Sequence, residues 1–342
     1  MIDMHAHWRP AELADALRSL TTEPPIVTGP DGAEVVSCRM GSDEPLAAAF
    51  DDPQFHLAKM QRLGVGTSVL SLLGSYCWVE SQPVETATTL CRIVNDRFSA
   101  LCQQHEGKFA AYAALPLRDM AAAAEEFERA LALPGIVGTQ VPGNAFLTAA
   151  EAESMRPLLE IANRRKAILF IHHGPRPGER FPKVGRETDN ARRRNGTLDM
   201  QASLSSVMTT LCLTDFLAPY PDARIHVHNL GGNIPYEVER MDHRCLLDTP
   251  QEELPSQRFR RAHVYVDCNS FGPHAIEAAV RLYGAERIVC GTDGTEFGVE
   301  WTSKAVAEAD IGDEARAQIL HRNAAALLAP LAPIAREYRA AA

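Results

Sequence analysis

Short apolar runs alternate with longer amphipathic segments along almost the whole chain. The runs lie at residues 2–7, 67–73, 109–117, 135–141, 167–173, 224–229, 263–268 and 287–293. They are apolar at most positions, as are the strands of a parallel sheet that is covered on both faces. The segments between them favour helices, which we expect at residues 8–20, 84–105, 120–133, 150–165, 198–217, 234–246 and 273–283. This order of elements predicts eight parallel strands closed into a TIM-like (β/α)8 barrel.

Residues 21–50 depart from this alternation. Two short β-like runs, at 26–28 and 34–37, are bounded by turns that contain proline and glycine, and they predict a small N-terminal β-hairpin insertion. The insertion is too small to have a core of its own, so we expect a single domain over residues 1–342. A doubly wound open sheet is disfavoured because no glycine-rich phosphate-binding turn follows the first strand.

Composition narrows the classes of partner. The chain has 342 residues, is 46% hydrophobic and carries a net charge of −10, which argues against binding nucleic acid or an anionic membrane. No apolar run is long enough to span a membrane, and no basic-then-apolar leader opens the chain. The 8 cysteines are scattered without a C-x-x-C pair, which favours reduced thiols and a cytoplasmic location.

The first strand carries Asp3, His5 and His7, which alternate with apolar residues and should share one face. Two imidazoles two residues apart can reach one metal ion, and neutral imidazole suits zinc and its neighbours in the first transition row. A His-X-His pair alone has little specificity, since the chain holds a second one at His226 and His228. Asp3 lies one layer deeper, where we expect it to support the ligands rather than to bind the metal.

Active sites of such barrels lie at the C-terminal ends of the strands. The polar candidates at these ends are His5, His7, His172, His173, His228 and Asp293. His172 and His173 are adjacent and point to opposite faces, so only one of them faces the interior. His226 lies deeper than His228 and is better explained as a packed or hydrogen-bonded histidine. The convergence of several such residues on one rim is a stronger signal than any one of them.

The chain resembles the amidohydrolase superfamily, in the branch of aminocarboxymuconate semialdehyde decarboxylase. The segments that carry the resemblance are IDMHAH (2–7), FIHH (170–173), HVHNLGGNIPYEVERMDH (226–243), CGTD (290–293) and HRNAAALL (321–328). They span nearly the whole chain in order, and the set is specific although no single segment is.

The resemblance implies one divalent metal ion, zinc in the first place and manganese as the alternative. Its ligands would be His5, His7, His172 and Asp293, and His228 would be the catalytic acid/base beside them. Three neutral imidazoles and one carboxylate with an open position are typical of a catalytic rather than a structural site. The relatives also suggest a homodimer or a higher homo-oligomer.

We therefore expect a non-oxidative, metal-dependent carboxy-lyase that acts on a small unsaturated or aromatic carboxylic acid. His228 or Asp293 would move the proton that replaces carbon dioxide. The alternative is a hydrolase or hydratase, in which metal hydroxide attacks a carbonyl or alkene and Asp293 is the base. Both chemistries use the same ligands in this superfamily. A binding protein with a vestigial site is disfavoured because every expected ligand is present.

Contacts to the substrate carboxylate are expected from the arginine-rich loop at residues 174–197, with Arg176 and Arg180 as the candidates. A solvated loop or a subunit contact explains the same arginines equally well. Trp8 and Trp78 lie at or just beyond strand ends, where they could form the wall of a pocket for a flat substrate.

Overall fold

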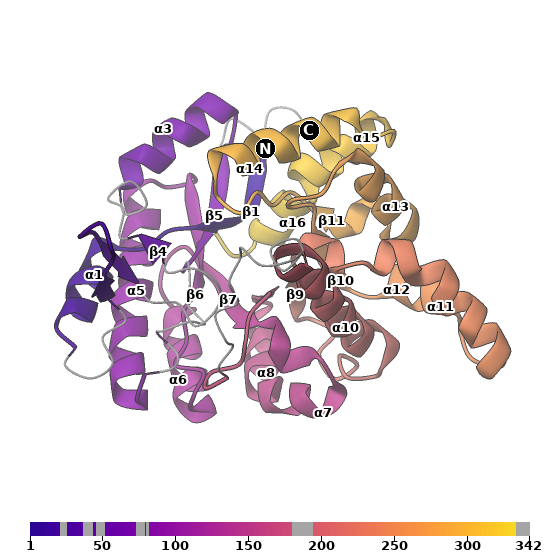
Figure 1. The fold of residues 1–342 in the computed structure, drawn as a ribbon, viewed down its shortest axis with the longest axis horizontal. Helices are drawn as coiled ribbons and strands as arrows, with labels where there is room; N and C mark the ends of the chain where they lie inside the picture. The colour runs from indigo at the N-terminus through magenta and orange to yellow at the C-terminus, as the bar shows by residue number, and fades with distance from the viewer. Residues whose placement is uncertain are drawn as a thin grey trace.

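The computed structural model describes residues 1–20, 26–36, 44–45, 52–72, 79, 82–179 and 194–332. An eight-stranded parallel sheet forms its centre, and neighbouring strands follow one another in chain order (Figure 1). The strands are β1 (Ile2–His7), β5 (Thr67–Ser71), β6 (Phe109–Ala113), β7 (Ile136–Pro142), β8 (Ile168–His172), β9 (Arg224–Val227), β10 (Val264–Asp267) and β11 (Ile288–Val289).

The first and last strands meet and close the sheet. The Met4 N–H donates to the carbonyl of Cys290 at 2.9 Å, and the Thr292 N–H donates to the carbonyl of His5 at 3.4 Å. The predicted TIM-like barrel is therefore confirmed. The eighth strand is shorter than predicted, since the chain leaves the sheet soon after Val289 and turns at Asp293.

Helices surround the barrel (Figure 1). They are α1 (Ala11–Arg18), α3 (Pro53–Leu63), α5 (Val84–Gln104), α6 (Met120–Ala130), α7 (Ala149–Ala152), α8 (Arg156–Arg165), α10 (Met200–Leu213), α11 (Ile234–Asp248), α12 (Pro255–Arg261), α13 (Pro273–Tyr283), α14 (Glu296–Glu308), α15 (Gly312–Ala317) and α16 (Asn323–Leu328). Single turns of 3-10 or π-helix are η1 (Gly143–Phe146), η2 (Glu153–Met155), η3 (Arg194–Asp199), η4 (Asn229–Gly231), η5 (Ala285–Arg287) and η6 (Gln318–Arg322). No helix among the described residues is long and apolar enough to cross a membrane.

Helix α3 was not predicted from the sequence, although its ends carry clear signals. The Asp52 side chain accepts a hydrogen bond from the Gln54 N–H at 2.8 Å, and Gly64 ends the helix with a φ of 72°. The buried face of α3 consists of His56, Lys59 and Met60, so two of its three buried residues are polar. Leu57 and Leu63 pack on the core beside Met60 but are only partly buried, so the apolar stripe that usually marks a packed helix is narrow here.

The insertion contains the predicted hairpin and one further strand. β2 (Ile26–Thr28) pairs antiparallel with β3 (Glu34–Val36), and β3 also pairs with β4 (Glu44–Pro45). A strand of two residues has no periodicity to detect, which explains why β4 was not predicted.

The hydrophobic core has two parts. The larger part lies between the barrel and the helices, and the smaller part fills the barrel with residues such as Met4, Tyr112 and Phe170. Leu327 and Leu328 of α16 belong to the inner part and cover the end of the barrel where the strands begin.

A bulge in β1 corrects the expected alternation of Asp3, His5 and His7. Asp3 pairs with Ser68 and Ala6 with Leu70, so β1 spends three residues where β5 spends two. Two consecutive residues therefore face the inside of the barrel. Met4 packs in its core, and His5 contacts the inward-facing ring of Phe170. The bulge thus places both histidines inside the barrel and separates Asp3 from their face.

The close pairing of β7 and β8 leaves no room for a side chain at position 138, and this can be tested. A Cβ atom at this position would lie 1.9 Å from the carbonyl oxygen of Ile168, which is backbone and cannot move without breaking the sheet. We expect Gly138→Ala to lower the free energy of unfolding by about 3 kcal/mol or more in urea titration. Gly272→Ala is the matched control, because a Cβ there meets nothing within 4 Å. Equal stability of the two variants would contradict the tight packing of these strands.

Candidate metal centre

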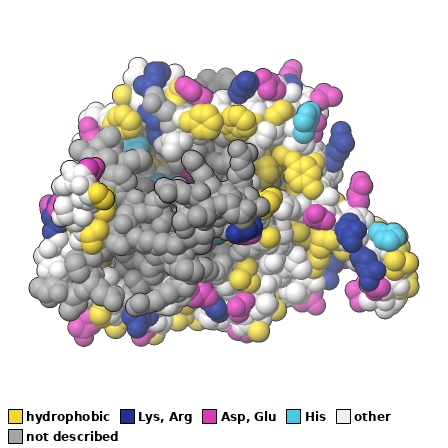
Figure 2. Space-filling model, in the orientation of Figure 1, with side chains coloured by type: hydrophobic (Ala, Val, Ile, Leu, Met, Phe, Trp, Pro, Cys, Tyr) yellow, Lys and Arg dark blue, Asp and Glu magenta, His cyan; other side chains and the backbone are white. Residues whose placement is uncertain are grey.

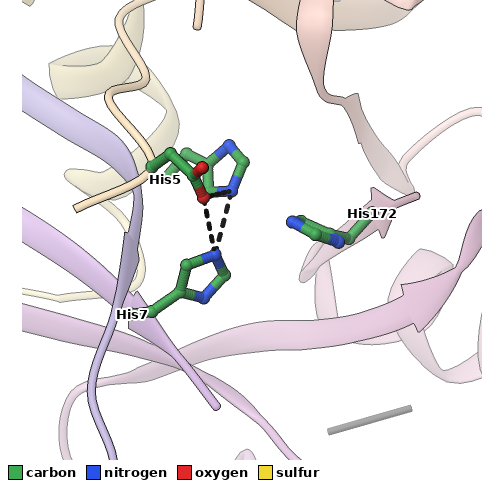
Figure 3. Close-up of side chains that lie close together, drawn as sticks. His5, His7 and His172 are labelled. Carbon is green, nitrogen blue, oxygen red and sulfur yellow. Dashed lines mark hydrogen bonds and ion pairs between the residues drawn. The ribbon is translucent and has the colours of Figure 1, made fainter. Parts of the chain in front are cut away.

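Four side chains converge at the C-terminal rim of the barrel. They are His5 and His7 of β1, His172 at the end of β8 and Asp293 beyond β11, and their ligand atoms all lie within 4.8 Å of one another. Figure 3 shows that His172 approaches the other side chains from the opposite side of the site.

The spacing of these atoms fits a single coordination shell. His5 Nε2 lies 3.2 Å from His7 Nε2, and Asp293 Oδ1 lies 3.0 Å from His7 Nε2 and 3.4 Å from His5 Nε2. Atoms bound about 2.1 Å from one ion are separated by about 3.0 to 3.4 Å at octahedral or tetrahedral angles. His5, His7 and Asp293 therefore have the spacing of ligands of one ion, and the ligand atom of His172 lies within 4.8 Å of each of them.

The second nitrogen of each ring is engaged elsewhere. His5 Nδ1 lies 3.2 Å from Asp267 Oδ2, and His172 Nδ1 lies 2.8 Å from the carbonyl oxygen of His173. His7 Nδ1 lies 2.9 Å from Ser71 Oγ. When each Nδ1 donates its proton to these acceptors, each Nε2 presents a lone pair to the centre. Two lone pairs that face each other at 3.2 Å repel unless a proton or a metal ion lies between them, so this donor set can share a proton in the metal-free protein and fits a divalent metal in its place.

Burial and neighbouring charges shift the pKa values of three of these residues in different directions. Burial would raise the pKa of Asp293, but the hydrogen bonds from His5 and His7 outweigh it and hold that pKa well below its usual range. Burial and the neighbouring ring of His228 hold the pKa of His172 well below its usual range. Burial alone would lower the pKa of His5, whereas the carboxylates of Asp267 and Asp293 raise it to about 10.

Asp293 is displayed by a turn that other residues hold in place. Its φ is 62° and that of Gly294 is 71°, which is left-handed backbone with a cost on the order of 1 kcal/mol for a non-glycine residue. The Lys59 ammonium donates to the carbonyl of Gly294. The Asp3 carboxylate accepts from the Thr292 N–H at 3.1 Å and from its hydroxyl at 2.5 Å. Asp3 thus supports the strand end that carries Asp293.

His228 lies beside the four-residue cluster and outside it. Its ring stacks on His172 with centroids 4.3 Å apart, and it is 2% exposed. Its Nε2 accepts the His173 backbone N–H at 2.8 Å, so the proton of the neutral ring must sit on Nδ1. No hydrogen-bond partner for that Nδ1 lies among the described residues. Burial and the charge on His5 hold the pKa of His228 well below its usual range, which favours the neutral ring.

Asp267, the last residue of β10, was missed in the sequence. It is fully buried and contacts both His5 and His226, whose Nε2 lies 3.1 Å from Asp267 Oδ2. The available signal was an acid inside the apolar run 263–268. His226 is 1% exposed and also contacts the Tyr112 hydroxyl, in agreement with the expectation of a packed, hydrogen-bonded histidine.

A cleft of about 310 Å³ opens beside Asp293. Its lining comprises Asn269, Ser270, Thr292, Asp293, Thr295, Phe297, Gly298 and Trp301. Phe297 and Trp301 are 70% and 41% exposed, and their ring centroids are 5.8 Å apart. Figure 2 shows hydrophobic side chains on this face of the molecule, above the residues drawn in grey. Phe297 and Trp301 are four residues apart and follow Asp293 closely, and this spacing was an available sign in the sequence of an aromatic wall beside the site.

The sequence model of the amidohydrolase family matches residues 2–329. The chain belongs to the amidohydrolase family. Among its curated relatives, the gamma-resorcylate decarboxylase of Rhodococcus jostii is 25% identical over 83% of this chain and 90% of its own length. The 2-amino-3-carboxymuconate-6-semialdehyde decarboxylase of Dictyostelium discoideum is 21% identical over 71% of this chain and 66% of its own length. The predicted branch of the superfamily is confirmed.

Solved structures show the same fold in this branch. The 5-carboxyvanillate decarboxylase of Novosphingobium aromaticivorans, in complex with manganese and 4-hydroxy-3-methoxy-5-nitrobenzoic acid, superposes with a TM-score of 0.71. The alignment covers 96% of this amidohydrolase and 95% of that chain at 15% identity.

Two of the residues expected to contact the substrate of this amidohydrolase, Trp8 and Arg176, are engaged with other parts of the protein. Trp8 is 4% exposed and packs on Phe98 in the outer core, with ring centroids 5.8 Å apart, and it does not line the cleft. The Arg176 guanidinium is bound by Glu179 at 2.7 Å and Glu151 at 3.2 Å. Contact of Trp8 and Arg176 with the substrate stays a prediction, and their places in the structure do not support it. Arg180 and Trp78 lie outside the described residues.

Competition between a metal ion and the proton of His5 gives a prediction for the apo protein. Below pH 10 His5 holds a proton that an incoming ion must displace, while Asp293 and His172 need lose none. We therefore expect about one divalent ion per chain, with release of about one proton at pH 7 and an affinity that rises about tenfold per pH unit. Calorimetry in buffers of different ionisation enthalpy measures the proton. A binding enthalpy that is independent of the buffer would show that no proton is released, and it would contradict a protonated His5 in the metal-free protein.

Proposed function

We propose that this amidohydrolase is a metal-dependent, non-oxidative decarboxylase of a small aromatic or unsaturated carboxylic acid. The observation that carries the proposal is the position of the ligand cluster. Its half-exposed member, Asp293, lines the same cleft as Phe297 and Trp301. A flat acid packed against the exposed faces of these aromatic rings would bring its carboxyl-bearing carbon close to the cluster. The decarboxylase relatives support the same chemistry.

The ion would be held by His5, His7, His172 and Asp293, whose ligand atoms all lie within 4.8 Å of one another, and it would displace the proton of His5. When bound, a divalent ion supplies Lewis-acid stabilisation to an oxygen of the substrate. Three imidazole nitrogens favour zinc. Manganese, which is bound in the 5-carboxyvanillate decarboxylase structure, is the alternative to test.

The reaction breaks the bond between the substrate carbon and its carboxylate, releases carbon dioxide and puts a proton on that carbon. His228 is a neutral ring whose Nε2 is occupied by the His173 N–H, so its Nδ1–H can donate a hydrogen bond that orients the substrate, and it loses no proton in the step. Asp293 is ionised and half-exposed in the cleft, so it can accept a proton from a substrate group and return it to carbon. Both residues belong to the proposed catalytic machinery.

A hydrolase or hydratase is the second candidate, because an ionised Asp293 at the open side of the cluster also suits a base that activates water. Carbon dioxide release separates the two candidates. Purified, metal-loaded protein should release carbon dioxide from at least one acid in a panel that includes 2,6-dihydroxybenzoate and 5-carboxyvanillate. Turnover of lactones or amides without any carbon dioxide would favour the second candidate.

The role of His228 can be tested by substitution. We expect His228→Ala to keep about one metal ion per chain and to lose about two to four orders of magnitude in kcat, as for one positioned acid/base. His274→Ala is the control, because the His274 side chain is 92% exposed and pairs with Glu277, which is not part of the cluster. A metal-free His228→Ala protein would make His228 a ligand. A variant that keeps both metal and rate would make His228 structural.

The aromatic wall of the cleft gives a separate prediction. Phe297→Ala and Trp301→Ala remove exposed ring area that would pack on an aromatic substrate, so KM should rise several-fold with less effect on kcat. Phe55→Ala is the control, because Phe55 is 45% exposed and does not line the cleft. If both cleft variants keep the parent KM, the substrate does not lie against these rings.

A further inference from the structure

We propose that Asp267 is a positioning residue that fixes which nitrogen of His5 is free to bind the metal ion. The inference rests on the metal site of the proposed function. It concerns a residue of β10 that does not belong to the ligand cluster and does not line the cleft.

Four hydrogen-bond donors surround the Asp267 carboxylate. Its Oδ1 accepts the backbone N–H groups of Asn229 at 3.0 Å and Asn269 at 3.1 Å. Its Oδ2 lies 3.2 Å from His5 Nδ1 and 3.1 Å from His226 Nε2. The side chain is fully buried, so water cannot substitute for any of these partners.

The direction of each hydrogen bond follows from this surrounding. Backbone N–H groups only donate, and an ionised carboxylate only accepts, so both histidine rings must donate to Oδ2. His226 agrees with this assignment, since its other nitrogen, Nδ1, lies 3.3 Å from the Tyr112 hydroxyl, which can donate to it. His5 must therefore carry a proton on Nδ1, and only its Nε2 is left for an ion.

The other two imidazoles are fixed differently. The acceptor for His172 is the backbone carbonyl of His173, which no side-chain substitution removes. The partner of His7 is the Ser71 hydroxyl, which can pass its own proton to the Ala6 carbonyl at 3.3 Å and accept from His7 Nδ1, but a hydroxyl can also turn and donate to the ring. Among the described residues, Asp267 is thus the side-chain partner of these ligands that, when ionised, can only accept and so permits a single tautomer.

Asp267→Asn is an informative substitution because it nearly keeps the shape of the side chain. If the amide oxygen accepts the two backbone N–H groups, the amide nitrogen faces His5 and His226 and must donate to them. His5 then accepts at Nδ1 and carries its proton on Nε2, where it blocks the ion. If the amide is turned, its nitrogen faces two backbone donors instead. Neither orientation leaves His5 Nε2 free without a lost hydrogen bond.

The test measures metal affinity rather than activity. We expect Asp267→Asn to keep its circular dichroism spectrum and to bind zinc about 10- to 100-fold more weakly in chelator competition. Tyr112→Phe is the matched control, since it removes a hydroxyl at the far end of the same network and leaves His5 untouched, and its affinity should stay within about threefold. Wild-type affinity in Asp267→Asn would overturn the proposal. If the wild-type protein bound no metal, the proposed function itself would fail.

A second measurement uses the wild-type protein and does not depend on whether the variant folds. In the zinc-loaded protein, long-range proton–nitrogen NMR spectra should show the His5 proton on Nδ1. A proton on Nε2, with the ion on Nδ1, would overturn the proposal.

Discussion

Closure of the barrel between β1 and the chain after β11 is the constraint on which the site depends. The hydrogen bonds from Met4 to Cys290 and from Thr292 to His5 bring the two ends of the sheet together. His7 Nε2 and Asp293 Oδ1, which are 286 positions apart in sequence, lie 3.0 Å apart as a result. A parallel barrel also puts every strand end on one rim, so His172 joins them without any special loop.

The imidazole nitrogens and the carboxylate of the cluster repel one another when no ion or proton lies between them, so the surrounding protein has to hold them together. Three imidazole nitrogens and a carboxylate turn toward one point because each ring is fixed from behind by Asp267, Ser71 or the His173 carbonyl. The left-handed turn at Asp293 is held in the same way, by Lys59 and Asp3. The rigidity of the barrel core supports all of these partners, since they lie on strands or on helices packed against them.

The two sides of the cluster have different environments, and this difference fits a catalytic role. On the side of His172 and His228 the rings are stacked, His228 is buried and His172 is partly buried, and the low pKa of each favours the neutral ring. On the side of Asp293 the cluster opens into a cleft with polar groups and two exposed aromatic rings. A substrate that enters from this side meets an ionised carboxylate first and a neutral hydrogen-bond donor deeper in the barrel.

The sequence by itself determined the barrel and the residues that meet at its rim. Apolar runs that alternate with amphipathic segments have few stable solutions, and the C-terminal ends of the runs gave His5, His7, His172, His173, His228 and Asp293 as candidates, from which the family resemblance selected the expected ligands. The tertiary structure decided how they meet. One extra residue in β1 took the Asp3 side chain off the face that carries the rings of His5 and His7, although its carboxylate still accepts the His5 N–H at 3.1 Å. The polar face of α3 brought Lys59 to the Asp293 turn. Periodicity reports which face a side chain occupies, but it carries no information on an inserted residue, on the partner behind a ring or on which nitrogen holds the proton. Those features depend on contacts between distant segments, such as Asp267 with His5, and only the folded chain makes them.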